Sequence, residues 1–153
     1  MVKIFSLVTS LFLAVNTGSL ASDNNIYEIR PYKITTVKSV SNIKNAAWSD
    51  NISSDETAES CAKFVLTKNN VREFFRLARQ ASEREYGHDL SMSRCSSSGE
   101  IIFANGDKGK WKIDRARRGL LTLSDGRAVY FYCAKCRPKV FEEPCDEKCM
   151  NGE

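Results

Sequence analysis

Cysteines are the residues of this 153-residue chain with the most distinctive chemistry, and four of the six lie close together near its end. Cys133 and Cys136 form a Cys-x-x-Cys motif, and Cys145 and Cys149 follow shortly after it. Three kinds of chemistry fit such a group: thiol–disulfide exchange, a tetrahedral zinc site, or structural disulfides. The choice depends on the compartment, because disulfides persist mainly outside the reducing cytoplasm.

The first residues of the chain predict export. Residues 1–21 contain a positive start at Lys3, an apolar run from Ile4 to Val15, and a small-x-small tripeptide that ends at Ala21. This is the layout of a secretory signal peptide, and the apolar run is shorter than the roughly 20 residues that span a bilayer. We therefore expect cleavage after Ala21 and a soluble protein in the periplasm or outside the cell, with no membrane contact after cleavage.

All six cysteines follow the predicted cleavage site, so an oxidising compartment favours a disulfide framework. Six cysteines allow 15 pairings, and the sequence alone does not choose among them. Proximity along the chain favours the pairs Cys133–Cys136, Cys145–Cys149 and Cys61–Cys95.

Redox exchange and zinc binding are the alternatives. Lys135 and Arg137 would lower the pKa of a neighbouring thiol, but thioredoxin-like sites place the motif at the start of a helix in a βαβ unit. Here Pro138 and Pro144 follow the motif, and no βαβ pattern occurs. The gap between the two cysteine pairs is short for zinc, and export favours oxidation. We therefore interpret the cysteines as structural and expect no cofactor or metal.

The predicted mature chain has the size of one domain. Removal of residues 1–21 leaves 132 residues with 22 basic and 19 acidic side chains, a formal charge of +3. Such a mild excess of positive charge does not by itself indicate nucleic acid, and an acidic protein is the more credible partner. We expect no nucleic-acid partner.

The chain divides into two parts. In residues 22–60, β-forming residues up to Val40 are followed by a polar stretch, which predicts an extended arm and a linker, with Pro31 limiting the arm to a sheet edge. Residues 61–153 are expected to form the compact domain. Its first seven residues, 61–67, have the composition of a short strand.

One helix is predicted over residues 68–87. Apolar residues at 71, 74, 75 and 78 follow the spacing of one helical face. Asn69 or Asn70 can cap its start, in preference to Thr67, and Gly87 can close its end.

Short strands are predicted after the helix, at residues 100–104, 110–114, 120–123 and 127–133, separated by turns that contain glycine. The predicted fold is therefore α+β, with one amphipathic helix packed on a small antiparallel β-meander and stapled by disulfides.

The last hairpin allows two registers, which place different residues on the two faces. A three-residue loop over 124–126, which Ser-Asp-Gly favours, puts Leu121 and Leu123 on the face of Val129 and Phe131. A two-residue turn would instead put these leucines beside the two tyrosines.

In the favoured register, tyrosines and basic residues share the opposite face. Tyrosine and arginine are common anchors at protein interfaces, so we expect this face to bind a partner. The expected partner-binding residues are Lys110, Lys112, Arg115, Arg117, Arg118, Tyr130 and Tyr132.

Catalytic patterns are weak. His88 is the only histidine, and no nucleophile-elbow motif accompanies it. The glutamate pairs 83/85 and 142/143 do not have the spacing at which two carboxylates face each other on a helix. We expect no catalytic residues.

The run from Cys61 to Cys136, above all its Trp-x-Ile-Asp…Gly…Ser-Asp-Gly…Tyr-Cys-x-x-Cys part, resembles a group of small exported bacterial proteins. The resemblance implies a periplasmic setting and carries over no functional residue. Together these observations favour a binding protein that recognises another protein, for example an immunity or inhibitor protein for a secreted toxin. The alternative is a redox factor or a zinc-stabilised domain that uses the C-terminal cysteines.

Overall fold

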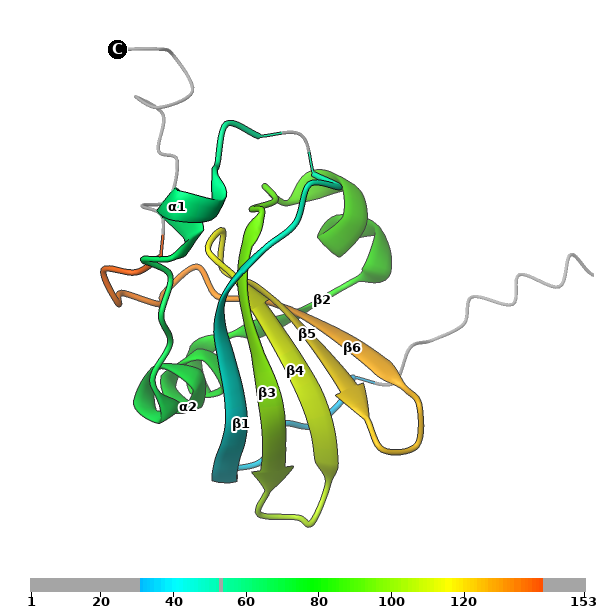
Figure 1. The fold of residues 1–153 in the computed structure, drawn as a ribbon. Helices are drawn as coiled ribbons and strands as arrows, with labels where there is room; N and C mark the ends of the chain where they lie inside the picture. Colours follow the sequence, from blue (N-terminus) through cyan, green and yellow to red (C-terminus); the bar gives the residue numbers. More distant parts are fainter. Residues whose placement is uncertain (1–30, 53, 142–153) are drawn as a thin grey trace, which may run out of the picture. The chain divides into compact units, whose positions relative to one another are not determined.

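A six-stranded antiparallel sheet dominates the computed structural model, which describes residues 31–52 and 54–141 (Figure 1). Its strands, in spatial order, are β1 (Val37–Trp48), β3 (Cys95–Phe103), β4 (Lys108–Asp114), β5 (Arg118–Leu123), β6 (Ala128–Tyr132) and β2 (Arg79–Ala81). The predicted meander is therefore present as β3 to β6, extended by one further strand on each side.

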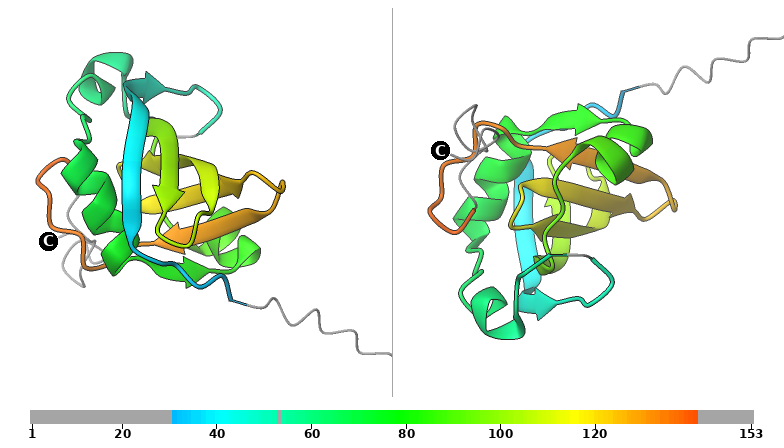
Figure 2. Two further views of the ribbon diagram at one scale, coloured as in Figure 1. Left: turned by 90° about the horizontal axis from the view of Figure 1, so that it is seen from below. Right: turned by 90° about the horizontal axis from the view of Figure 1, so that it is seen from above.

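Within the described residues, three short helices accompany the sheet: α1 (Ala58–Cys61), α2 (Lys68–Leu77) and the π-helix η1 (Glu85–Asp89). We call the face that packs against α2 the inner face, and the opposite one the outer face. The segment after Cys133 lies on the same side of the sheet as α2, where Phe141 contacts Phe74 (Figure 2). The class is α+β, with more sheet than helix. No helix in the described ranges is long and apolar enough to cross a membrane.

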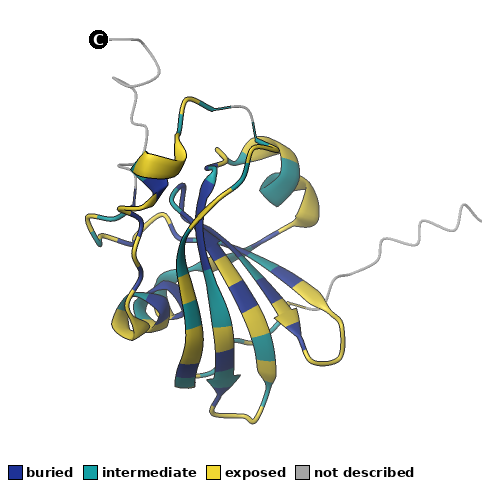
Figure 3. Cartoon of the chain, in the orientation of Figure 1, coloured by how far each residue is buried: buried dark blue, intermediate teal, exposed yellow. Residues whose placement is uncertain are grey.

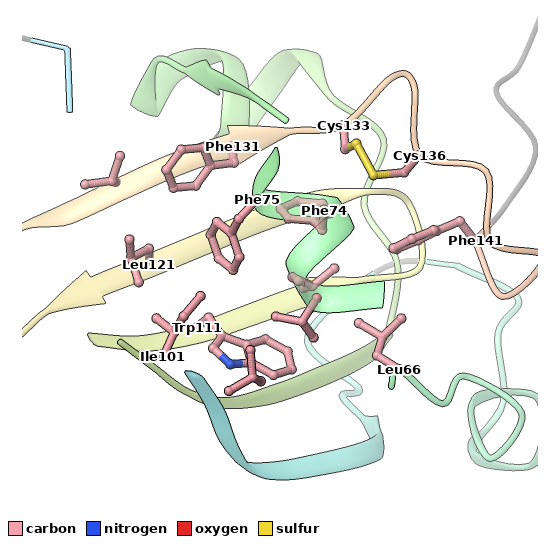
Figure 4. Packing of buried hydrophobic residues seen from close by; sticks show 14 of the residues in the cluster. Leu66, Phe74, Phe75, Ile101, Trp111, Leu121, Phe131, Cys133, Cys136 and Phe141 are labelled. Carbon is pink, nitrogen blue, oxygen red and sulfur yellow. A yellow bond between two sulfur atoms is a disulfide. The ribbon is translucent and has the colours of Figure 1, made fainter. Parts of the chain in front are cut away.

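The core lies between the inner face and α2 (Figure 4). Phe75 of α2 contacts Phe103 and Phe131 edge-on, at centroid distances of 5.9 and 5.6 Å. Buried and exposed residues alternate along the central strands, as the side-chain period of a sheet with one covered face requires (Figure 3). The side chains that close this core from the sheet include Ile101, Trp111, Ile113 and Leu121.

The expected linker was wrong over residues 41–48, which belong to β1. Val37–Trp48 pairs with β3 along its length, and the compact unit of the fold begins at Pro31. Register shifts interrupt the pairing, and Asn42 and Ala46 adopt positive φ values of 50° and 60°. These irregularities break the alternation of apolar and polar residues by which a strand is recognised in a sequence.

The predicted helix was too long. Helix α2 ends at Leu77, because Ala78 is extended and the next three residues pair with β6 as β2. The predicted cap was also wrong. Thr67 accepts a hydrogen bond from Asn70 N, and the Asn70 side chain accepts one from Thr67 N, a reciprocal capping box.

Residues 61–67 do not form the predicted strand. They run beside β1, where Phe64 and Leu66 point into the core and Val65 is 47% exposed. Asn45 replaces a strand partner here, because its side chain accepts a hydrogen bond from Leu66 N and donates one to Leu66 O. Apolar residues therefore alternate as predicted, but the hydrogen bonds to β1 come from the Asn45 side chain and one backbone bond, from Ala46 N to Phe64 O.

The favoured register of the last hairpin is confirmed. Leu121 pairs with Val129, and both belong to the inner, buried face together with Phe131. Gly126 occupies the left-handed position of the three-residue turn with φ 88°.

Two of the predicted disulfides, Cys61–Cys95 and Cys133–Cys136, are present. The first joins the end of α1 to the start of β3, and the second closes the turn that follows β6. The proposed third pair, Cys145–Cys149, lies outside the described residues, as does the predicted signal peptide. Two disulfides indicate an oxidising, non-cytoplasmic compartment.

Candidate protein-binding surface

A row of lysines stands on the outer face of β4. Lys108, Lys110 and Lys112 alternate with inward-facing residues, and all three are exposed. Their Cα positions are two residues apart, so the row repeats about every 7 Å along the strand. The outer face therefore presents three amines in line.

The neighbouring strands extend this surface, which we call the lysine surface. Its central residues are Lys108, Lys110, Lys112, Glu100 and Thr122. Thr122 and Glu100 flank Lys110 in register, and a shallow groove of about 440 Å³ runs past both. Glu100 Oε2 accepts a hydrogen bond from the side-chain amide of Asn42, at 2.7 Å.

Positive charge is characteristic of the whole described body. Residues 31–52 and 54–141 hold 20 lysines and arginines against 12 aspartates and glutamates, a formal charge of +8. This excess is larger than the balance of the whole chain, +4, because acidic residues are concentrated at its end. A field of this sign attracts acidic partners over distances of about a Debye length.

The predicted tyrosines lie on the outer face but are only partly exposed. Tyr130 stacks on Tyr86 of η1 with centroids 4.8 Å apart, and the guanidinium of Arg79 lies 5.4 Å from the Tyr132 ring. Leu120 separates Tyr130 from Lys112 in register. The tyrosines thus form one border of the lysine surface.

Two of the predicted partner-binding arginines are not available to a partner. Arg117 and Arg118 are only 4% and 5% exposed. Arg118 points back to the sheet because its Nε donates to Asp114 Oδ2 at 2.8 Å and its Nη1 donates to Tyr86 O at 2.7 Å. The prediction was wrong because residues 115–117 form a tight turn, and because Arg118, the first residue of β5, is held on the outer face by Asp114 and η1.

Arg115 also has a structural partner. Its guanidinium forms an ion pair with Glu56 at 2.6 Å, and Ser93 Oγ donates to the same carboxylate at 2.6 Å. Burial opposes the ionisation of Glu56, yet the bonds from Ser93, Arg94 and Arg115 bring its pKa below the usual 4.5. This cluster fastens the loop before α1 to the strand end at β3.

Asp114 is buried beneath η1, and burial is the main reason why its pKa rises from 3.8 to about 6. Arg118 and the backbone N–H groups that face the carboxylate oppose this rise without cancelling it. Desolvation also raises the pKa of Tyr86, whose ring lies 4.6 Å from the Arg118 guanidinium.

This shift predicts a pH dependence of stability. A carboxyl whose pKa is higher in the folded state stabilises the fold below about pH 4 and loses that contribution as the pH rises through about 6. We expect Asp114 to lower the free energy of unfolding by about 3 kcal/mol between about pH 4 and about pH 7. Urea denaturation of wild type and Asp114→Asn at several pH values gives the free energy of unfolding as a function of pH for each protein. The contribution of Asp114 is the difference between the two slopes of this free energy against pH. Equal slopes in the two proteins would contradict the prediction.

The cysteines of the Cys-x-x-Cys motif are buried. Cys133 and Cys136 are 0% and 1% exposed and are bonded to each other. A buried disulfide offers no open path to an attacking thiolate, and its sulfurs are not thiolate ligands for zinc. These two observations disfavour the redox and zinc alternatives at this pair. His88, in η1, is exposed.

Sequence reasoning missed three residues that border or belong to the surface: Arg79, Tyr86 and Lys108. Lys108 could have been found, because it continues the alternation of Lys110 and Lys112. Arg79 and Tyr86 could not, because their segment has the composition of a helix and reaches the outer face only through β2 and η1.

Comparisons of the chain with protein-family models, with curated proteins and with solved structures find no match.

Proposed function

We propose that this protein is an exported binding protein whose lysine surface recognises an acidic face of another protein, in the periplasm or outside the cell. The observation that supports this most directly is the exposed row of Lys108, Lys110 and Lys112 on one side of β4. The lysine side chains do not contribute to the core. The buried contacts that stabilise β4 come from Trp111 and Ile113, on the other side of the strand.

A flat sheet face is suited to a protein partner. The strands hold the amines at fixed spacing, so little backbone entropy is lost when a partner binds. The partly exposed tyrosines at the border add the amphipathic rings that often anchor interfaces. Neutralisation of a secreted toxin, in the manner of an immunity or inhibitor protein, is the form of this function that small size and disulfides support.

Charge reversal tests the proposal. With a photo-crosslinking amino acid at Thr122, the wild-type protein should capture its partner from the extract of its own compartment. The variant Lys110→Glu/Lys112→Glu should capture at least tenfold less, because two attractions become repulsions. Captured partner should also decline steeply with added salt.

The matched control is Lys63→Glu/Lys68→Glu, which changes the net charge equally at exposed lysines outside the lysine surface. It should capture the partner as wild type does. Equal losses in the two variants would mean that net charge alone governs binding, and no loss in Lys110→Glu/Lys112→Glu would show that the lysine surface is the wrong one.

A further inference from the structure

A second surface lies where the chain enters β1. A groove of about 490 Å³ separates residues 34–37 from the second half of α2. It is distinct from the lysine surface, because α2 packs on the inner side of the sheet. Its lining residues are Ile34, Thr35, Thr36, Val37, Arg72, Phe75, Arg76 and Ala78.

One wall of the groove is an unpaired strand edge. β1 is the first strand of the sheet, and among the strands of the described residues it pairs only with β3. Val37 lies opposite Phe103, whose N–H donates to Asp107 O on the far side, at 2.9 Å. In an antiparallel ladder such a pair exchanges no hydrogen bonds, so the N–H and C=O of Val37 point away from β3, to the groove.

Backbone groups along other parts of β1 do have hydrogen-bond partners. Farther along β1, Ala46 N donates to Phe64 O, and Asn45 binds both backbone groups of Leu66. At the start of β1, Thr36 O accepts from Ala104 N on the β3 side. The segment 61–67 therefore covers the late part of the edge, and among the described residues none performs this role beside Val37.

The other wall carries two guanidinium groups. Arg72 and Arg76 are one helical turn apart on α2, so their side chains project from the same face. Both are exposed, and neither forms an ion pair with a carboxylate of the described chain. No acidic residue lines the groove, and its floor includes the ring of Phe75. The groove thus combines backbone donors and acceptors, an apolar floor and positive charge.

We propose that this groove binds an extended acidic segment of a partner protein by β-strand addition. The segment would lie antiparallel or parallel to the start of β1 and exchange hydrogen bonds with Val37. Side chains of a strand alternate, so every second residue, a carboxylate, would meet Arg72 and Arg76 on the side of α2, and the residues between them would point to the outer side of the sheet. This site goes beyond the lysine surface and does not depend on it.

Model peptides test the proposal on the full mature protein. An acetylated hexapeptide that alternates valine with glutamate should bind, with amide shifts at Val37 and Phe75 in NMR titration. The same peptide N-methylated at alternate amides should bind at least tenfold more weakly, because it cannot pair with a strand edge. A valine–lysine hexapeptide should not bind.

Variants of the chain complete the test. Arg72→Glu/Arg76→Glu should weaken binding of the valine–glutamate peptide at least tenfold, and Arg84→Glu/Arg137→Glu, an equal charge change at exposed arginines outside the groove, should not. Equal affinity for the N-methylated peptide would overturn strand addition. A loss caused by Lys110→Glu/Lys112→Glu instead would move the peptide to the lysine surface and overturn the groove.

Discussion

Replacement of both Cys61 and Cys95 by alanine is expected to lower the free energy of unfolding by about 4 kcal/mol. The disulfide spans 34 residues of sequence, and a loop of this length removes about that much chain entropy from the unfolded state. It also ties α1 to the start of β3, and both half-cystines are fully buried. Denaturant unfolding of the exported protein measures the loss.

Cys133→Ala/Cys136→Ala is the matched comparison. This disulfide spans only 3 residues of sequence, so the same entropy argument gives about 2 kcal/mol. We therefore expect Cys61→Ala/Cys95→Ala to lose about twice as much free energy of unfolding as Cys133→Ala/Cys136→Ala. Equal losses would mean that packing of the buried sulfurs, rather than loop closure, determines the contribution of each bridge.

Phe74→Ala is the second change with a large expected effect. Phe74 is fully buried and contacts Phe75 and Phe141. Its ring also rests on the backbone of β5: a Cβ at Gly119 would lie 2.6 Å from Phe74 Cε1. Removal of a buried phenylalanine side chain costs about 3–5 kcal/mol, and we expect that loss here.

A double-mutant cycle tests the contact between Phe74 and Gly119. Gly119→Ala should cost about 1–3 kcal/mol in the wild type, because the added methyl overlaps the ring. In the Phe74→Ala background the same change should cost much less, since the space is open. Gly87→Ala, with nothing within 4 Å of the added Cβ, is the control and should be nearly neutral. Additive effects would show that the helix does not rest on Gly119.

Much of the sheet could be predicted from local sequence. Buried residues alternate with more exposed ones along most of β4 to β6 and along the second half of β3, and Ser124–Gly126 has the composition of one turn type. Once the turn is chosen, the register of the hairpin follows, and with it the faces of Leu121 and Tyr130. The lysine row was predictable for the same reason, because strand alternation places Lys110 and Lys112 opposite Trp111.

Other parts could not be predicted because their structure depends on distant partners. The edge strand β1 is irregular at Asn42 and Ala46, and its pairing with β3 compensates for the lost alternation. Residues after Leu77 have helical composition, yet three of them complete the sheet beside β6. Hydrogen bonds to an existing strand edge outweigh the small differences in helix propensity.

The sequence by itself determined the meander and the alternating faces of its strands, and proximity along the chain favoured the Cys133–Cys136 bridge. Tertiary structure alone decided which basic residues are free. Arg118 turns inward because Asp114 and Tyr86 O meet it beneath η1, whereas Arg72 and Arg76 meet no carboxylate in the described chain. Charge is a property of the residue type, but its availability depends on neighbours that only the fold brings together.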